Sequence, residues 1–370
     1  MGISRMTLPK LHGRSPIKSL GVGFVLALSV STPTVADEAW YPFPIEVWDP
    51  PFDMASPRND ASYVALEKAS QKWRICVSIP HLKDAYWLAV NYGVTDEARR
   101  LGVQMDLYEA GGYGNLKTQL EQIAECVAGG AQGVIISAIS LDGLNELVAD
   151  LAARNIPVVD LVNGMSSDKL SAKSLVSFQD MGFRAGAYVA NRHAKDGRRI
   201  RVAWFPGPEG AGWVAAGDRG FRAAFEGKNV EVVATRHGDT GVEAQGKLIE
   251  AVLDEGIEID FIVGTSVTAE AAVKILRKRK LADRIKVMSY YYSPGVHRAI
   301  KRGKIIGAPS DLQAIQGRIA MDQIVRILEG KSYRKHVGPK IQVIDRSNIN
   351  AFDTTTTLAP KGFRATFSVN

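Results

Sequence analysis

Short metal-binding and phosphate-binding motifs are absent from this sequence. Its two cysteines and six histidines show no CxxC, HExxH or HxH spacing, so we predict no metal site. No GxGxxG loop opens a first strand-to-helix turn, and no GxxxxGK[ST] loop occurs. The glycine-rich stretch GGYGN at residues 111–115 interposes a tyrosine and matches neither pattern. These absences argue against nucleotide binding.

Catalytic signatures are missing as well. No GxSxG turn surrounds a serine, and no two carboxylates share a strand end in the way that glycoside hydrolysis requires. Asp239 and Glu243 precede an expected helix, where acidic residues cap the helix or suit its dipole. A binding cleft without activated groups is the simpler interpretation. We therefore predict that the protein is not an enzyme and uses no cofactor.

Apolar runs long enough to cross a membrane are absent after residue 36. Before it, an acid-free segment with four basic residues leads into an apolar core at residues 20–30, which is short for a membrane span. Small residues then lead to Ala36. This order predicts a secretory signal over residues 1–36, with the mature protein exported and not inserted in a membrane. The alternative is an uncleaved N-terminal anchor.

A broad basic surface is also missing, although the formal net charge is +7. Four of the 46 lysines and arginines lie in the predicted signal, which leaves 42 against 39 acidic residues, about +3. The one basic run, residues 275–280, is expected to end a helix, where cations suit the dipole. We predict no nucleic-acid partner, because such a partner needs a wider basic face with stacking or base-reading residues.

The two cysteines, Cys76 and Cys126, fall in the first expected strand and near the end of the second expected helix. Two cysteines in an exported chain favour one disulfide, because that compartment is oxidising. Two buried free thiols are the alternative, since cysteine is also a common core residue.

From residue 72 onward, short β-branched runs alternate with amphipathic segments, a pattern typical of parallel sheets flanked by helices. One series of strands and helices ends near residue 180, and a second begins with the strand RIRVAWF. The sequence therefore predicts two Rossmann-like α/β lobes with a ligand cleft between them. We expect the N-terminal lobe to comprise residues 37–180 and 310–345. The other lobe would comprise residues 181–309 and 346–370.

Aromatic residues gather at the carboxyl ends of the expected strands, where ligands of open α/β sheets bind. They are Tyr86, Trp87, Tyr113, Phe178, Trp204, Phe205, Trp213 and Tyr290 to Tyr292. Several aromatic faces around one point attract a methylated cation, and a carboxylate such as Asp84 would balance its charge. The alternative for each ring taken alone is core packing, because large rings are mostly buried. Trp87, for example, shares a helical stripe with Val90 and Val94.

Several longer stretches carry a family resemblance. They are LKDAYWLAVNYG, YEAGGY, PGPEGAG, GFRAAFEG, GTSVTAEAA, SYYYSPGVHRAIKRGKI and PSDLQAIQGRIA. Together they resemble the type I, sugar-binding class of periplasmic binding proteins. Within that class they resemble the trimethylamine N-oxide-sensing proteins of the Tor respiratory system. The likeness covers residues 73–363 and includes both cysteines.

The resemblance implies a binding protein that closes on trimethylamine N-oxide and governs the periplasmic domain of a membrane sensor histidine kinase, inducing N-oxide respiration. The ligand cage of the family carries over onto Asp84, Tyr86, Trp87, Tyr113 and Tyr291. Phe178 completes the set, but the family has a tryptophan there, and a phenyl ring attracts cations more weakly than an indole.

Two alternatives stay open at this stage. The chain could be the substrate-binding protein of an ABC transporter, either for a methylated amine or for a sugar. Sugar binders use Asp, Asn and Arg at these strand ends. The stretch at the expected helix 269–279 is instead GTSVTAE, without the Asn-Asp pair often found there, which argues against a sugar.

Overall fold

The computed structural model describes residues 2, 39–193 and 197–370 of the chain. The predicted signal, residues 1–36, lies outside the described residues except for Gly2. From Trp40 to Asn370 the chain forms one compact unit. Within the described ranges, no helix combines the length and the apolar character that a membrane crossing requires.

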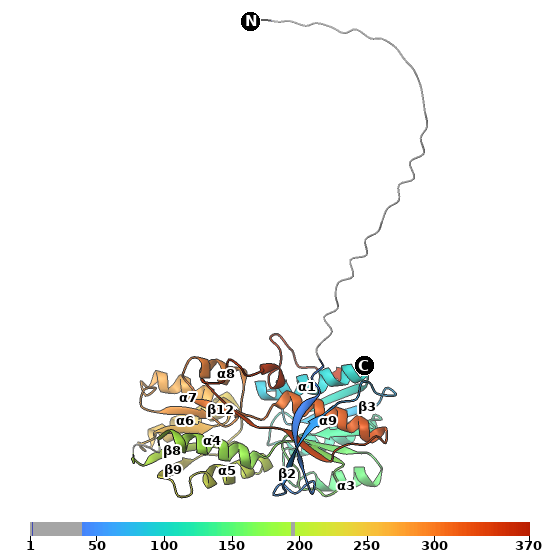
Figure 1. Cartoon of the computed structure of the whole chain (residues 1–370), viewed down its shortest axis with the longest axis horizontal. Helices are drawn as coiled ribbons and strands as arrows, with labels where there is room; N and C mark the ends of the chain where they lie inside the picture. Colours follow the sequence, from blue (N-terminus) through green and yellow to red (C-terminus); the bar gives the residue numbers. More distant parts are fainter. Residues whose placement is uncertain (1, 3–38, 194–196) are drawn as a thin grey trace. The chain divides into compact units, whose positions relative to one another are not determined.

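A large mixed sheet organises the first lobe (Figure 1). In the described residues its strand order is β15-β4-β3-β5-β6-β7-β13-β1-β2. The strands are β1 (Phe43–Trp48), β2 (Arg58–Tyr63), β3 (Arg74–Ile79), β4 (Gln104–Glu109), β5 (Gly133–Ile136), β6 (Val158–Leu161), β7 (Ala172–Ser174), β13 (His336–Pro339) and β15 (Ser368–Val369). Strands β4 to β13 of this order are parallel, whereas β15, β1 and β2 pair antiparallel at the two edges. The helices α1 (Ala85–Leu101), α2 (Leu116–Ala128), α3 (Asn145–Ala153) and α9 (Gln313–Leu328) pack with it.

The second lobe is built on a parallel sheet of order β11-β10-β8-β9. Its strands are β8 (Ile200–Phe205), β9 (Val230–Thr235), β10 (Phe261–Gly264) and β11 (Lys286–Ser289). Its helices are α4 (Phe178–His193), α5 (Gly212–Ala223), α6 (Val242–Asp254), α7 (Ser266–Lys278) and α8 (Pro294–Lys301). A separate antiparallel pair, β12 (Gly307–Ser310) and β14 (Gln342–Asp345), and a short 3₁₀ turn, η1 (Thr354–Thr356), complete the described elements.

The predicted α/β fold with two parallel-stranded sheets is confirmed, since β7 and β8 belong to different sheets. The tail departs from the expected division. Residues 346–370 were assigned to the second lobe, but β15 pairs with β4 of the first sheet. A strand this short has no periodic pattern of its own, so its partner cannot be derived from local sequence.

The expected boundary at residue 180 also differs from the structure, because it falls inside α4. Strand β7 ends at Ser174, and the helix begins at Phe178. Ser177 precedes the helix, and its Oγ accepts a hydrogen bond from the backbone N–H of Asp180 at 3.1 Å. A serine in this position stabilises a helix start by satisfying one of its free amide groups.

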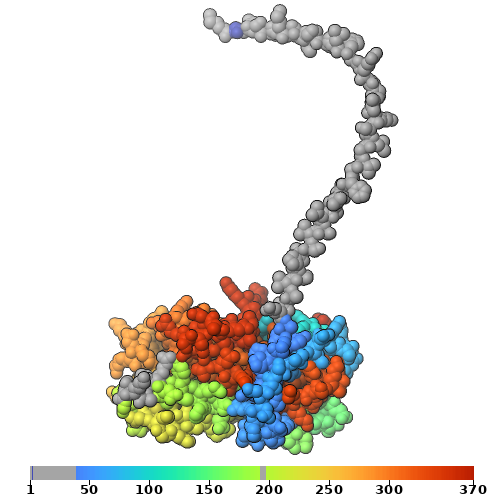
Figure 2. Space-filling model, in the orientation of Figure 1, coloured from blue at the N-terminus to red at the C-terminus, as the bar shows by residue number. Residues whose placement is uncertain are grey.

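The predicted disulfide between Cys76 and Cys126 is present, with their Cα atoms 6.2 Å apart. It ties α2 to β3 of the first sheet. The N-terminal hairpin β1–β2, which the sequence pattern did not indicate, joins the same sheet through β13. Figure 2 shows this N-terminal segment, in blue, lying beside C-terminal segments in red on the face in view.

Candidate functional site

A small cavity lies where the carboxyl ends of strands from both sheets meet. It is lined by Tyr86, Trp87, Tyr113, Val162, Asn163, Phe178, Trp213, Thr240 and Tyr291. The centre of a water molecule can occupy only about 20 Å³ of it, and one water needs roughly 10–15 Å³ of such space. The rings therefore leave little open space between them in this structure.

The structure brings five of the six expected site residues together around this cavity, namely Tyr86, Trp87, Tyr113, Phe178 and Tyr291. The sixth, Asp84, does not line it. Its Oδ1 accepts hydrogen bonds from the backbone N–H groups of Tyr86 at 3.1 Å and Trp87 at 3.2 Å. Asp84 is thus the N-cap of α1, and it fixes the first turn on which two of the rings stand.

Asp84 is half-buried, and burial raises the pKa of its carboxyl from 3.8 to about 6, against the opposing effect of the two amide hydrogen bonds. The carboxylates of Asp239 and Glu270 add to this shift. Because burial disfavours an isolated negative charge, a cation near Asp84 would stabilise its ionised form. A neighbouring positive charge would therefore lower the pKa of Asp84.

Tyr86 is held in place from the other side of the cavity wall. Its hydroxyl donates to Oδ2 of Asp311 at 2.6 Å, and the same oxygen accepts from Gln316 at 2.7 Å. The Tyr86 and Tyr291 rings meet edge to face, with centroids 5.0 Å apart. Tyr86 therefore presents a fixed ring rather than a free hydroxyl.

The Tyr113 hydroxyl is different, because it accepts two hydrogen bonds. Nε1 of Trp213 and Nδ2 of Asn163 each donate to it at 3.1 Å. Its own proton has only a long contact of 3.5 Å, to Oδ1 of Asn163. Burial raises the pKa of Tyr113, so the phenol keeps this proton. A hydroxyl with both lone pairs occupied is left with a donor for a ligand.

The remaining aromatic residues divide between the cavity and the core. Trp213 lies with its ring centroid 5.9 Å from that of Phe178 and 6.1 Å from that of Tyr291. Tyr290 is buried behind them, and its hydroxyl lies 3.2 Å from the carbonyl oxygen of Phe178 and 3.3 Å from that of Trp213, either of which can accept its one proton. Trp204 stacks on Phe221 in the core of the second lobe. Phe205 and Tyr292 are also fully buried.

Residues beside the cavity connect the two lobes. Nε2 of His81, after β3, lies 2.9 Å from Oγ1 of Thr240, after β9. Nζ of Lys83 forms an ion pair with Asp239 at 3.2 Å. Burial lowers the pKa of His81 from 6.5 to about 4, although the charge of Asp239 acts in the opposite direction. His81 is therefore neutral at neutral pH, and this contact between lobes is an uncharged hydrogen bond.

Asn163, Thr240 and Val162 line the cavity but were not among the expected site residues. Each follows a strand: Val162 and Asn163 are the first two residues after β6, and Thr240 lies in the loop after β9. Their position after a strand is the sequence feature that could have identified them as site residues. In the part of the chain that the structure describes, no group of three His, Cys, Asp or Glu side chains could hold a metal ion.

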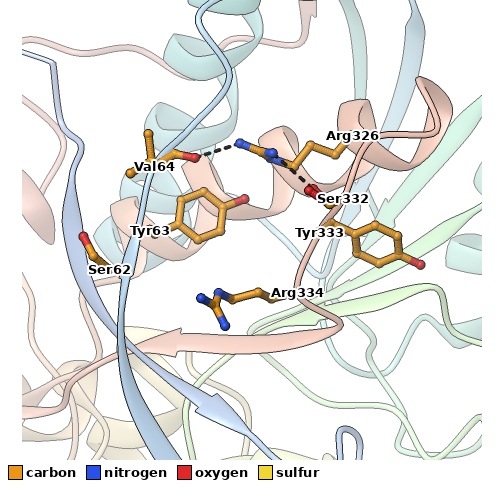
Figure 3. A pocket seen from close by; sticks show the side chains of 7 residues that line it. All are labelled: Ser62, Tyr63, Val64, Arg326, Ser332, Tyr333 and Arg334. Atoms are coloured by element: carbon orange, nitrogen blue, oxygen red, sulfur yellow. Dashed lines mark hydrogen bonds between the residues drawn. The ribbon is translucent and has the colours of Figure 1, made fainter.

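A second hollow, shown in Figure 3, is lined by Ser62, Tyr63, Val64, Arg326, Ser332, Tyr333 and Arg334. Arg326 donates to the carbonyl oxygens of Val64 at 2.7 Å and Ser332 at 3.1 Å, and to Asp322 at 2.6 Å. Its guanidinium therefore joins the end of β2 to the segment after α9. This hollow is a structural junction at the surface, remote from the strand ends of the second lobe.

Comparisons with known proteins show which family the chain resembles. Residues 75–332 match the family model described as periplasmic binding protein domain. The chain is 37% identical over 316 residues to periplasmic protein TorT of Escherichia coli (strain K12), covering 84% of this chain and 90% of that protein.

Solved structures extend the likeness. An ABC transporter solute binding protein from Bradyrhizobium sp. BTAi1 with bound Bis-Tris is 51% identical, with a TM-score of 0.77, and the match covers 89% of this chain and 98% of that one. The complex of the TorS sensor domain with TorT in the presence of TMAO contains a chain that is 32% identical, with a TM-score of 0.72. That match covers 80% of this chain and 100% of the other.

Proposed function

The chain belongs to the periplasmic binding protein family and is a periplasmic protein, and from that premise we propose that it is a non-catalytic sensor of trimethylamine N-oxide or a similar methylated amine. In this proposal the bound form signals to the periplasmic domain of a membrane sensor histidine kinase and so controls N-oxide respiration. The observation that carries the proposal is the cavity walled by Tyr86, Trp87, Tyr113, Phe178 and Tyr291.

The chemistry of the ligand accounts for this combination of groups. Trimethylamine N-oxide surrounds a positive nitrogen with three methyl groups, which donate no strong hydrogen bonds and suit aromatic faces. Its single oxygen accepts hydrogen bonds, and the proton of Tyr113 is available to donate one. The Asp84 carboxylate, at the start of α1, would balance the positive end.

A sugar fits the lining less well. A sugar ring needs several polar groups for its hydroxyls, but the polar side chains here already have partners. Nδ2 of Asn163 donates to Ala138 and to Tyr113, and Thr240 is hydrogen-bonded to His81. The sugar-transport alternative is therefore the weaker one.

Uptake of a methylated amine by an ABC transporter is a second candidate, favoured by the likeness to the Bradyrhizobium solute binding protein. The same cage would serve it, since the two functions differ in the protein partner rather than in the ligand. The discriminating measurement is complex formation with the purified periplasmic domain of the sensor kinase, followed by analytical ultracentrifugation with and without ligand. A complex supports the sensor, whereas ligand binding without a complex favours the transporter.

The cage itself is tested by calorimetry with trimethylamine N-oxide, betaine, choline and ribose. Trp87→Leu keeps apolar bulk but removes an aromatic face, so we expect N-oxide affinity to fall about two- to thirtyfold, from a ring contribution of about 0.5–2 kcal/mol. Phe183→Ala, at an exposed aromatic on α4, is the control and should leave affinity unchanged. Binding of ribose alone would overturn the proposal.

A further inference from the structure

We propose that Trp213 is the specificity-determining ring of this cavity, and that it couples the size of the ligand to closure of the two lobes. The inference rests on the proposed function, in which the cavity takes a compact methylated amine. Trp213 belongs to the second lobe, near the start of α5, and it lines a cavity to which both lobes contribute residues.

The second lobe holds the indole in a fixed position. The Trp213 ring stacks on Tyr290, with an interplanar angle of 19°. Gly207 also contacts the ring: it has a φ of +123°, and a Cβ atom there would lie 2.5 Å from Cη2 of the indole. The slot therefore depends on a glycine, both for its backbone conformation and for its space. These two contacts hold the ring to the second lobe.

The same residue reaches the first lobe. Nε1 of Trp213 donates to the Tyr113 hydroxyl at 3.1 Å. The adjacent Gly212 lies against the loop after β6, because a Cβ there would be 3.4 Å from the carbonyl oxygen of Asn163 and 2.8 Å from Cδ1 of Leu141. The start of α5 thus packs against the first lobe next to the position where Trp213 lines the cavity.

Two consequences follow for the ligand. Trp213 donates to one lone pair of the Tyr113 hydroxyl, and Asn163 donates to the other. Because Trp213 belongs to the second lobe, both lone pairs are occupied only when that lobe is in place, and the Tyr113 proton is then directed to a ligand. The ring also limits the space beside Phe178, 5.9 Å from its centroid. A head group larger than trimethylamine N-oxide would displace Trp213 and break its bond to Tyr113.

The test compares trimethylamine N-oxide with choline by calorimetry on wild type, Trp213→Ala and Trp213→Phe. In Trp213→Ala the space opens, so we expect N-oxide affinity to fall more than tenfold while choline loses less. Trp213→Phe keeps a ring and loses the N–H, so N-oxide affinity should fall about two- to tenfold, the range of one hydrogen bond. The exchange variant Phe178→Trp/Trp213→Phe asks whether the position of the indole matters, and we expect it to bind N-oxide more weakly than wild type.

Trp48→Phe is the matched control, because Trp48 is a buried indole that stacks on His336 and does not line the cavity. It should lower the melting temperature without changing the order of ligand affinities. A purely structural Trp213 would behave in the same way, with both ligands weakened in proportion, and that result would overturn the inference. Unchanged affinities in Trp213→Ala would overturn it as well. If wild type binds neither methylated ligand, the proposed function fails first and the role of Trp213 falls with it.

Discussion

At the scale of single residues, Asp84 combines two roles that a substitution can separate. Its Oδ1 caps α1 through the amides of Tyr86 and Trp87, and its charge faces a partly buried environment. Asparagine caps a helix about as well as aspartate does. The variant Asp84→Asn therefore keeps the first turn of α1 and removes the charge alone.

This separation gives a pH prediction. Burial raises the pKa of Asp84 to about 6, so the carboxylate is increasingly protonated as the pH falls through this value. If the ionised form balances the positive nitrogen of the ligand, wild-type affinity should decrease between pH 7.5 and about pH 5.5. Asp84→Asn should bind more weakly at pH 7.5 and show a flatter profile. Calorimetry at several pH values checks this, and parallel profiles for the two proteins would contradict it.

At the scale of elements, α1 and α9 pack closely because glycines face the partner backbone; both helices are seen side by side in Figure 1. A Cβ at Gly93 of α1 would lie 2.2 Å from the carbonyl oxygen of Ala314 of α9. A Cβ at Gly317 of α9 would lie 2.9 Å from the carbonyl oxygen of Val90. Since α1 carries Tyr86 and Trp87, this packing also sets the position of two cavity rings.

Gly93→Ala should consequently destabilise the protein by about 1–3 kcal/mol or more, because backbone atoms must move apart. Gly246→Ala is the control, since Gly246 lies inside α6 and a Cβ there would meet nothing within 4 Å. The same substitution should stabilise the protein by about 0.4–1 kcal/mol at that site. Urea unfolding of both variants measures the difference, and equal effects would show that the α1–α9 contact can relax.

The elements also show what the sequence could predict. The strand and helix series of both lobes followed from alternating apolar patterns, and the disulfide followed from two cysteines in an exported chain. The pairing of β15 and of the polar strand β2 depends on distant partners, so local patterns did not contain it. Neighbouring residues show the same limit at the site, because Tyr291 lines the cavity while Tyr290 packs behind it. Tyr290 and Tyr291 are adjacent tyrosines after the same strand, so local sequence does not tell which of them faces the cavity.

At the scale of the whole molecule, contacts between the lobes surround the cavity. They include His81 with Thr240, Lys83 with Asp239, and Trp213 with Tyr113. A ligand enclosed in the cavity touches residues from both lobes and so stabilises the form in which these contacts exist. Because His81 takes part in one of these contacts and titrates, the stability of the form in which the lobes are in contact should depend on pH.

His81 gives this dependence a definite sign. Its pKa is about 4 in the folded protein, where it is fully buried, and 6.5 when exposed. Between these values the unfolded chain binds more protons, so stability is present at neutral pH and is lost as the pH falls from about 6.5 towards 4. The contribution between pH 7 and pH 5 is about 2 kcal/mol. His336, whose pKa burial lowers to about 3, acts in the same direction, whereas Asp84 opposes both.

The variant His81→Gln isolates this contribution, because glutamine can still donate a hydrogen bond to Thr240 but does not titrate. His336 and Asp84 are unchanged in it, so their effects cancel in the comparison with wild type. Without ligand, the loss of stability from pH 7 to pH 5 should be smaller in His81→Gln by about 2 kcal/mol. Urea unfolding at the two pH values measures this difference. An equal loss in both proteins would mean that His81 takes up its proton without breaking the contact between the lobes.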